Sequence, residues 1–282
     1  MNEISSNSDT LTRFLLPEAH TRGAVIRGSQ IFAEARRIHG LNGPVATQFG
    51  QTLLASILLL SISKGGIRQI LQLDATTQAP VNRMMAEARS GAVRGYLNWM
   101  EKETVLRFEK GDNLGSWMGS PVRLSTVRDL GVGQPYISTI ENESDFLADH
   151  LMHYLNQSVQ IRADIILIGD FAVMIEAMPG CDEAHWFKAV ETMAKIPDAV
   201  LKSATTESFL SCFEELRCKA VGSDRYAYSC DCTIEKMAAA IHSIAVDQLQ
   251  ELSDEQGNIT ASCQYCDKHY AVKADSILNP EV

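Results

Sequence analysis

The chain contains one long apolar run, residues 53–62. This run is too short to span a bilayer, and it follows polar side chains such as Gln48 and Gln51. A Gly-Pro pair at 43–44 suits the first turn of a helix, and a Gly-Gly pair at 65–66 suits its end. The pattern therefore predicts a long helix that is buried in a protein core.

Shorter patterns on either side of this run predict an antiparallel sheet beside helices. Residues 22–27 favour a first strand, and Ser29 can cap a helix that ends near His39. Ser144 can likewise cap a helix at 145–157. The remaining predicted strands cover 67–73, 82–88, 92–99, 163–168 and 171–175.

The composition changes at residues 178–180, Met-Pro-Gly, where the strand patterns stop. Two helical patterns follow, at 183–195 and 207–218, without strands that would give them a sheet to cover. We interpret this stretch as a helical linker that packs on another part of the protein. Phe213 is expected to be a buried aromatic side chain that anchors it.

The last part of the chain predicts a strand, a helix and two further strands. The first strand passes through Tyr226 and Tyr228, and the helix extends over 233–252. Residues 259–262 and 268–272 read as two strands around a turn. The candidate core residues of the helix are Ile234, Met237, Ile241, Ile244 and Leu252.

Four cysteines in this last part carry the chemistry of the chain. Cys230-x-Cys232 is followed, after a helix-length insert, by Cys263-x-x-Cys266. Two tight thiol pairs can bring four soft sulfur ligands to one point, which suits the tetrahedral preference of zinc. We therefore expect one zinc ion per reduced chain, because only these four cysteines have chelating spacing.

The fold class that follows is α+β, with one large and one small domain. The chain has 282 residues and is 45% hydrophobic, which is enough for a sizeable core. We expect an N-terminal domain of antiparallel sheets packed with helices at 1–178 and a helical linker at 179–222. A small zinc-binding domain is expected at 223–282.

Other interpretations of the cysteines remain open. The site could be a static zinc knuckle, and His269 could be its neighbour or a substitute ligand. A thioredoxin-like role is disfavoured, because that motif should open a helix after a strand. The spare thiols are expected to be small buried hydrophobes, with auxiliary redox sensing as the alternative: Cys181, Cys212 and Cys218.

Several functions receive no support from the sequence. The chain has no phosphate-binding loop, and a turn explains Gly131-Val132-Gly133 better than a dinucleotide site does. His150 and His153 lack a metalloprotease pattern, so surface or capping roles are expected for them. We therefore expect no enzymatic activity.

Charge and the N-terminal sequence restrict partners and location. The formal net charge is −10, and residues 223–282 carry ten acidic and four basic side chains. Nucleic-acid binding requires the opposite sign. The N-terminus resembles neither a secretory signal nor a transit peptide, so we expect a cytoplasmic protein that binds neither nucleic acid nor membranes.

Several segments, in the same order, resemble landmarks of one known family: residues 12–16 with 22–23, 130–133 with 139–140, 153–161, 230–236 and 263–270. The family is the heat shock protein 33 family of redox-regulated holdase chaperones, and the resemblance covers nearly the whole chain. Thr233 and Lys236 stand where the family usually has serine and arginine, which preserves a hydroxyl cap and a positive charge. The stretch between Ile140 and Ser144 looks shorter than usual, and Arg217-Cys218 stands where bulky apolar residues are common.

The resemblance implies an ATP-independent chaperone that is inactive when reduced and zinc-bound. Oxidation would release zinc, unfold the linker and expose a surface that binds unfolding proteins, and it would allow a homodimer to form. We expect the disulfides to join near neighbours, Cys230 with Cys232 and Cys263 with Cys266. The alternatives are a constitutive zinc-binding adaptor or assembly factor, and a dithiol oxidoreductase without zinc.

Overall fold

The computed structural model describes residues 8–63, 65–100, 111–241, 252–254 and 256–273. By its internal contacts the chain divides into two compact units, Met1–Tyr228 and Ser229–Val282. The sequence pattern places the start of the last domain slightly earlier, at 223. The α+β class is confirmed, because a large sheet and several helices occur together.

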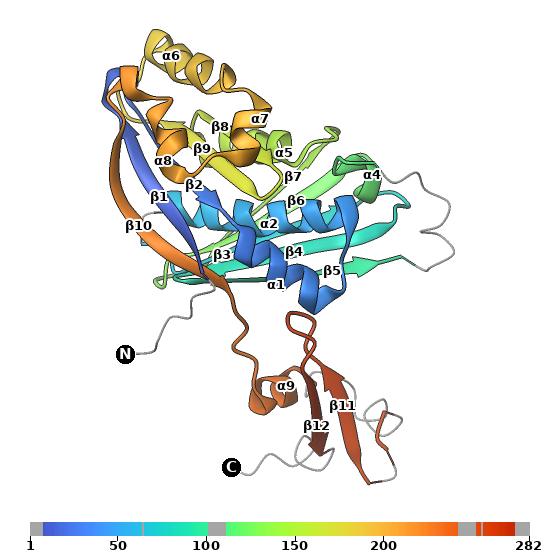
Figure 1. Cartoon of the computed structure of the whole chain (residues 1–282). Coiled ribbons are helices and arrows are strands. Elements are labelled where there is room, and N and C mark those ends of the chain that lie inside the picture. The colour runs from blue at the N-terminus through green and yellow to red at the C-terminus, as the bar shows by residue number, and fades with distance from the viewer. Residues whose placement is uncertain (1–7, 64, 101–110, 242–251, 255, 274–282) are drawn as a thin grey trace. The chain divides into compact units, whose positions relative to one another are not determined.

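One ten-stranded sheet organises the first unit, in the order β7-β6-β3-β4-β5-β10-β1-β2-β9-β8 (Figure 1). Neighbouring strands are antiparallel except β5 and β10, which pair in parallel over only two positions. This short junction divides the sheet into a β3 half, from β7 to β5, and a β1 half, from β10 to β8. The strands are β1 (Asp9–Leu16), β2 (Thr21–Arg27), β3 (Arg68–Ala75), β4 (Val81–Arg89), β5 (Ala92–Trp99), β6 (Val122–Asp129), β7 (Tyr136–Asn142), β8 (Ala163–Ile168), β9 (Phe171–Ala177) and β10 (Lys219–Tyr228).

Helix α2 (Gly43–Ile62) packs against both halves of the sheet, as Figure 1 shows. It contacts β3, β4 and β5 on one side and β2 and β9 on the other. Its length and composition would allow it to cross a membrane, but 83% of its most apolar 18-residue window is buried in the protein. The predicted buried helix is therefore confirmed. Around it lie α1 (Ser29–His39), α4 (Gly115–Met118), α5 (Leu147–Tyr154) and the π-helical turn η2 (Leu155–Val159).

The linker helices cover the opposite face of the β1 half. Side chains alternate along β2, so that Ala24 and Ile26 face α2 while Val25 faces the linker. Phe213 is fully buried against Phe14, which confirms it as an aromatic anchor. The linker contains α6 (Glu183–Ala194), α7 (Asp198–Ser203), α8 (Thr206–Ser211) and the short turn η3 (Glu214–Leu216).

Some boundaries differ from the sequence prediction. Strands β1, β6 and β7 and the first half of β10 were not predicted. The single helix predicted at 207–218 is broken after α8, and Arg217 adopts a left-handed conformation with φ 53°. Helix α5 begins later than predicted, because Ser144 Oγ accepts the Phe146 N–H at 3.1 Å and holds the preceding turn.

The second unit is built from α9 (Ile234–Ile241) and a hairpin of β11 (Asn258–Ser262) and β12 (His269–Lys273). Its buried apolar cluster contains Ile241, Ile259 and Val272. Ile241 is therefore confirmed as a core residue. Ile234 and Leu252 are 45% and 57% exposed, so their assignment to the core was wrong, and Ile244 lies outside the described residues.

Candidate metal centre

The first cysteine pair lies directly before α9. Thr233, the residue after Cys232, caps this helix, because its Oγ1 accepts the Lys236 N–H at 3.3 Å. Lys236 in turn donates from Nζ to Asp231 Oδ2 at 2.6 Å and to the Asp231 carbonyl at 2.8 Å. The hydroxyl cap that the sequence predicts is thus present, and it fixes the chain on both sides of Cys232.

The second pair occupies the turn between β11 and β12. The Cys263 carbonyl accepts the N–H groups of Cys266 at 3.3 Å and Asp267 at 2.8 Å. The Cys263 N–H donates to the Lys268 carbonyl at 2.9 Å, and Asp267 adopts a left-handed conformation with φ 58°. The strand-turn-strand prediction is therefore confirmed, and the turn holds Cys263 and Cys266 close together.

All four predicted cysteines converge on one point. Their Sγ atoms lie within 4.8 Å of one another, with Cys230 and Cys263 3.7 Å apart and Cys232 and Cys266 3.3 Å apart. A tetrahedral zinc site with Zn–S bonds of about 2.3 Å has sulfurs about 3.8 Å apart. This donor set and spacing fit zinc, so the four cysteines could hold a metal ion.

Tyr270 contacts this cluster and was not identified from the sequence as part of it. Its hydroxyl lies 3.1 Å from Cys232 Sγ and donates to the Cys232 carbonyl at 3.0 Å. The only signal was its position, four residues after Cys266 on the following strand. The hydroxyl links the two cysteine pairs, because it comes from β12, which follows the second pair, and bonds Cys232 of the first pair.

The cluster favours ionisation at one sulfur. Burial alone would raise the pKa of Cys232, but hydrogen bonds with the Tyr270 hydroxyl and the other three thiols outweigh it and lower this pKa to about 7. Burial and the neighbouring thiols raise the pKa of Cys266. The hydrogen bond to Cys232 raises the pKa of Tyr270 to about 12, so this hydroxyl stays a donor. A readily formed thiolate suits both metal binding and oxidation.

The histidines considered from the sequence do not join this centre. Within the described residues, the group of potential ligands contains the four cysteines alone. His269 Nδ1 instead lies 2.6 Å from Ser262 Oγ. His150 is fully buried and donates from Nε2 to the Ser144 carbonyl at 2.8 Å, so it is not a surface residue.

The three spare thiols differ from one another. Cys218 is half-buried against the apolar face of the linker, and burial raises its pKa to about 11. Cys181 is also half-buried, and its thiol lies 3.5 Å from the Ala19 carbonyl. Cys212 is exposed at the end of α8, so the expectation of burial was wrong for it.

Comparisons with known proteins agree with this fold and site. A model of the Hsp33 protein family matches residues 9–273. The 33 kDa chaperonin of Desulfotalea psychrophila is 28% identical over 280 residues, covering 93% of this chain and 94% of the relative. That of Levilactobacillus brevis is 25% identical over 288 residues, covering 96% of each.

A solved structure gives the same result for the fold. The crystal structure of the 33 kDa chaperonin (heat shock protein 33 homolog) from Thermotoga maritima matches with a TM-score of 0.76. The match covers 97% of each chain at 20% sequence identity. Fold, cysteine cluster and relatives together define a chaperone with a C-terminal cysteine centre. The chain belongs to the Hsp33 family.

Proposed function

We propose that this chain is a redox-regulated, ATP-independent holdase that binds unfolding proteins under oxidative stress and catalyses no reaction. The observation that carries the proposal is the four-cysteine cluster within a unit whose described core is very small. Such a unit depends on its metal centre, and that centre is made of oxidisable groups. The chemical state of the sulfurs can therefore decide whether the unit folds.

In the reduced chain, one zinc ion is held by Cys230, Cys232, Cys263 and Cys266. When bound, zinc keeps all four sulfurs as thiolates and adds about 10–16 kcal/mol to folding, the range typical of small structural sites. Tyr270 orients Cys232 through its hydroxyl. The Thr233 cap and the turn at Cys263 hold the two pairs in place.

Oxidation removes the ligands. A thiolate attacks hydrogen peroxide to give a sulfenic acid and hydroxide, and a second thiolate then attacks that sulfur and expels a second hydroxide as the disulfide forms. Each disulfide thus reduces one peroxide. The cluster geometry favours no single pairing, because all four sulfurs lie within reach of one another. We expect Cys230–Cys232 and Cys263–Cys266, because loop closure favours sequence neighbours once the unit unfolds.

The linker is the element that responds. Cys230 follows the end of β10 by two residues, so unfolding of the second unit frays the strand that anchors the linker's C-terminal end. The linker, at 179–222, buries Phe209, Phe213 and Met193 against the β1 half. Its release exposes apolar side chains on both surfaces, and these can bind unfolded proteins by mass action without nucleotide. In this scheme residues 1–178 form the chaperone core and 223–282 the redox switch.

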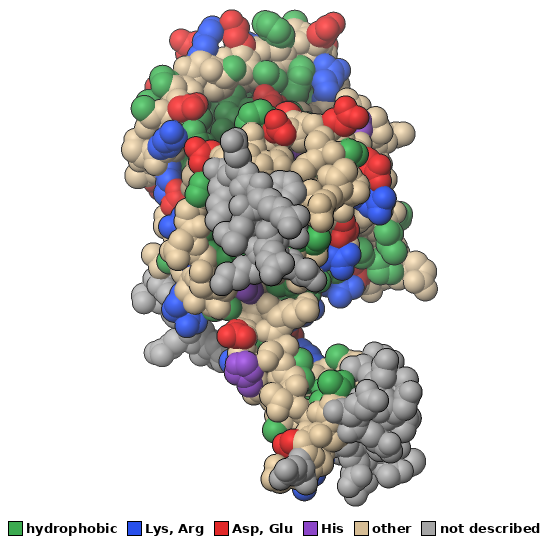
Figure 2. Space-filling view, turned by 90° about the vertical axis from the view of Figure 1, so that its right-hand side faces the viewer, with side chains coloured by type: hydrophobic (Ala, Val, Ile, Leu, Met, Phe, Trp, Pro, Cys, Tyr) green, Lys and Arg blue, Asp and Glu red, His purple; other side chains and the backbone are tan. Residues whose placement is uncertain are grey.

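The proposal also covers the oligomeric state, the location and the partners of the chain. The active form is a homodimer in the cytoplasm, and it binds neither nucleic acid nor membranes. Lys and Arg side chains alternate with Asp and Glu over the face drawn in Figure 2, which offers no basic patch there. This mixed surface and the net charge of −10 disfavour nucleic acid as a partner.

The test combines metal release with client protection. Peroxide should release zinc from the reduced chain, and light scattering should show that aggregation of an unfolding client is suppressed in step with that release. Cys263→Ser should lose zinc, whereas the matched control Cys212→Ser should retain it. Zinc that stays bound under peroxide would favour the constitutive adaptor, and full zinc in Cys263→Ser would reject the ligand assignment.

A further inference from the structure

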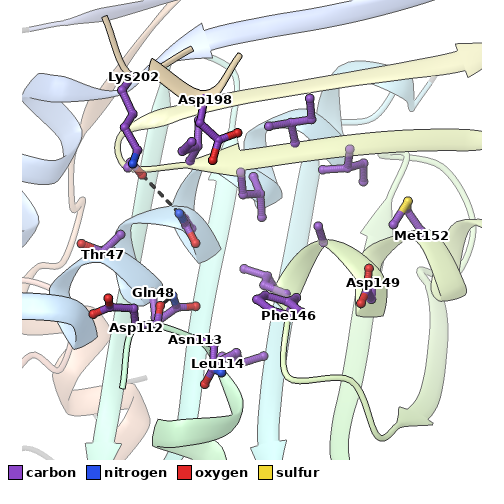
Figure 3. A pocket seen from close by; sticks show the side chains of 18 residues that line it. Thr47, Gln48, Asp112, Asn113, Leu114, Phe146, Asp149, Met152, Asp198 and Lys202 are labelled. Carbon is purple, nitrogen blue, oxygen red and sulfur yellow. Dashed lines mark hydrogen bonds between the residues drawn. The ribbon is translucent and has the colours of Figure 1, made fainter. Parts of the chain in front are cut away.

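A groove of about 600 Å³ lies in the first unit, apart from the cysteine centre. Its walls come from α2, the start of α5, the segment before α4, strand β8 and linker helix α7 (Figure 3). Figure 2 shows hydrophobic side chains within recesses on one face of this unit, bordered by acidic ones. Because both the sheet and the linker line this groove, movement of the linker removes one of its walls.

Strand β8 brings an open main-chain edge to this groove. Among the described residues, β8 pairs only with β9, across the two-residue turn Gly169-Asp170. Because Ile168 faces Phe171 next to that turn, the alternation of an antiparallel pair directs the N–H and C=O of Leu167 away from β9. Within the part of the chain that the structure describes, neither group has a hydrogen-bond partner. Leu167 therefore offers a free donor and acceptor.

The neighbouring position on the same edge is partly blocked. Ile165 also directs its N–H outward, and this group donates to the carboxylate of Asp164 at 2.9 Å. Such a local cap occupies one donor of the edge strand and opposes indiscriminate strand pairing. The open stretch of the edge thus begins beyond Ile165 and lies inside the groove.

Two buried amide side chains of α2 face the same space. Gln48 and Gln51 line the groove at 5% and 7% exposure. Their Nε2 groups donate to the Asp112 carbonyl at 2.7 Å and to the Gly169 carbonyl at 3.4 Å. Their Oε1 atoms have no partner within the described residues and are not among its buried unpaired atoms, so both acceptors are accessible to a ligand that carries N–H donors.

The rest of the lining is mostly apolar, with Thr47 and Asn113 as uncharged polar residues and with an acidic rim. Phe146 is 60% exposed, and it lies across the groove from the side chains of β8 in Figure 3. The charged side chains of the rim are three acids and one base, namely Asp112, Asp149, Asp198 and Lys202. An apolar ligand with basic ends fits this lining.

One arginine holds the linker helix at the rim. Arg27 donates from Nη2 to the Leu201 carbonyl at 2.7 Å and from Nε to the Ala204 carbonyl at 2.9 Å. Its Nη1 also pairs with Asp170 in the β8–β9 turn at 2.5 Å. The same residue thus fixes the end of α7 and the end of β8, so release of the linker frees one wall of the groove.

We propose that this groove binds an extended apolar segment of an unfolding protein, flanked by basic residues, as an added strand on β8. Only an extended polypeptide presents alternating N–H and C=O groups that match Leu167 together with further N–H donors for Gln48 and Gln51. The inference rests on the proposed function, because it names where the client binds. The oxidised form binds more tightly than the reduced form, since α7 no longer narrows the groove.

The first experiment tests main-chain recognition on the full-length oxidised protein. The probe is a fluorescent peptide of alternating valine and threonine with lysine at both ends. Its control is the same peptide with alternate amides N-methylated, which keeps the side chains but cannot pair as a strand. Fluorescence anisotropy should show at least about tenfold weaker binding of the methylated peptide, since several hydrogen bonds are lost. Equal affinity for the two peptides would overturn strand addition.

The second experiment tests whether the peptide binds at the β8 edge of this groove. Leu167→Pro removes the outward N–H but no β8–β9 hydrogen bond, and Leu167→Ala removes only the side chain. Phe146→Ser removes the exposed aromatic, with Ile137→Ser as its control, because Ile137 is 74% exposed on the other edge strand. Leu167→Pro and Phe146→Ser should each bind the peptide about tenfold more weakly than the original chain does. The controls Leu167→Ala and Ile137→Ser should bind it with an affinity within about twofold of the original. Circular dichroism checks that each variant folds.

The outcomes separate this proposal from the holdase function. If the oxidised chain suppresses aggregation while Phe146→Ser and Leu167→Pro are unaffected in both assays, the groove is rejected and the holdase stands. Peptide binding at the groove without suppression of aggregation would reject the holdase and leave the groove as a peptide site. Loss of both activities in the unaltered oxidised chain would reject both.

Discussion

The two units of the chain hold their structure in different ways. In the first unit, α2 and the two halves of a ten-stranded sheet bury large apolar side chains in a continuous cluster. In the second, the described cluster contains Ile241, Ile259 and Val272, beside the buried Cys263. Burying such a side chain contributes roughly 1.5–3 kcal/mol, whereas a structural zinc contributes about 10–16 kcal/mol. One unit is therefore stabilised by solvent exclusion, and in the proposed function the other is stabilised by metal–sulfur bonds that an oxidant can remove.

Metal removal should separate the units most strongly. A chelator that strips zinc from the reduced chain should unfold the second unit, because its described apolar cluster is small. The sheet of the first unit should persist apart from the frayed C-terminal end of β10. Hydrogen exchange read by mass spectrometry should show loss of protection after Ser229 and persistence of protection along α2. Retained protection in β11 and β12 of the metal-free chain would show that apolar burial suffices there.

The linker can be weakened without touching the metal. Phe213→Ala removes a fully buried ring that packs on Phe14 and Phe209, and it should cost about 3–5 kcal/mol of linker docking. Limited proteolysis should then cut the linker while zinc remains bound, and holdase activity should rise in part. The matched control is Phe187→Ala, because Phe187 is 65% exposed on α6, and it should change little. A resistant linker in Phe213→Ala would mean that other contacts hold it.

Acid should weaken the two units for different reasons. In the first, burial lowers the pKa of His150 below its usual 6.5, so the folded state favours the neutral ring. This contribution is fully present above about pH 6.5 and is lost as pH falls through the lowered pKa. In the second, protons would compete with the proposed zinc for the cysteine sulfurs.

The histidine contribution can be measured from urea unfolding of the first unit at several values between about pH 7 and pH 5, with hydrogen exchange in β9 as the signal. In the original chain, the free energy of unfolding should fall as the pH falls. His150→Gln should flatten this pH dependence, and His153→Gln should leave it unchanged. An unchanged slope in His150→Gln would assign the acid sensitivity to other groups.

The smallest effect should come from the charge pair beside the metal centre. Lys236 and Asp231 pair at 2.6 Å with side chains that are 56% and 52% exposed. Exposed pairs contribute at most about 1 kcal/mol, so Lys236→Ala should retain zinc. A chelator competition assay should give a zinc affinity within about fivefold of the original chain. A much larger loss would mean that Lys236 orients Cys232 through Asp231.

The elements predicted from sequence were those whose cause is local. The buried helix α2, the hairpin β8–β9 and the four-cysteine cluster follow from an apolar run, a Gly-Asp turn and chelating spacing. Tyr270 was missed because nothing in its neighbourhood indicates that its hydroxyl reaches Cys232, 38 positions earlier.

The missed strands depend on distant partners. Strand β1 pairs with β10, for example Leu11 with Asp224, across most of the chain. Strand β7 lies at the edge of the sheet with much of its length exposed, so its apolar alternation is weak. Helices α6 and α8 of the linker were predicted, whereas α7 was not. The sheet face that they cover is formed by β1, β2 and β9, which come from two separate parts of the sequence.

The position of β10 sets the geometry of any linker release. The segment between β9 and β10 is attached at both ends to strands of the same sheet. Once undocked, about 40 residues would form a closed loop rather than a free tail. In a closed loop of this length, the side chains stay at an effective concentration near the millimolar range relative to the surface that they covered. Redocking is then an intramolecular step that needs no search through solution. In the proposed function, the return to the docked state would then depend on the refolding of the second unit and on any client that occupies the exposed face.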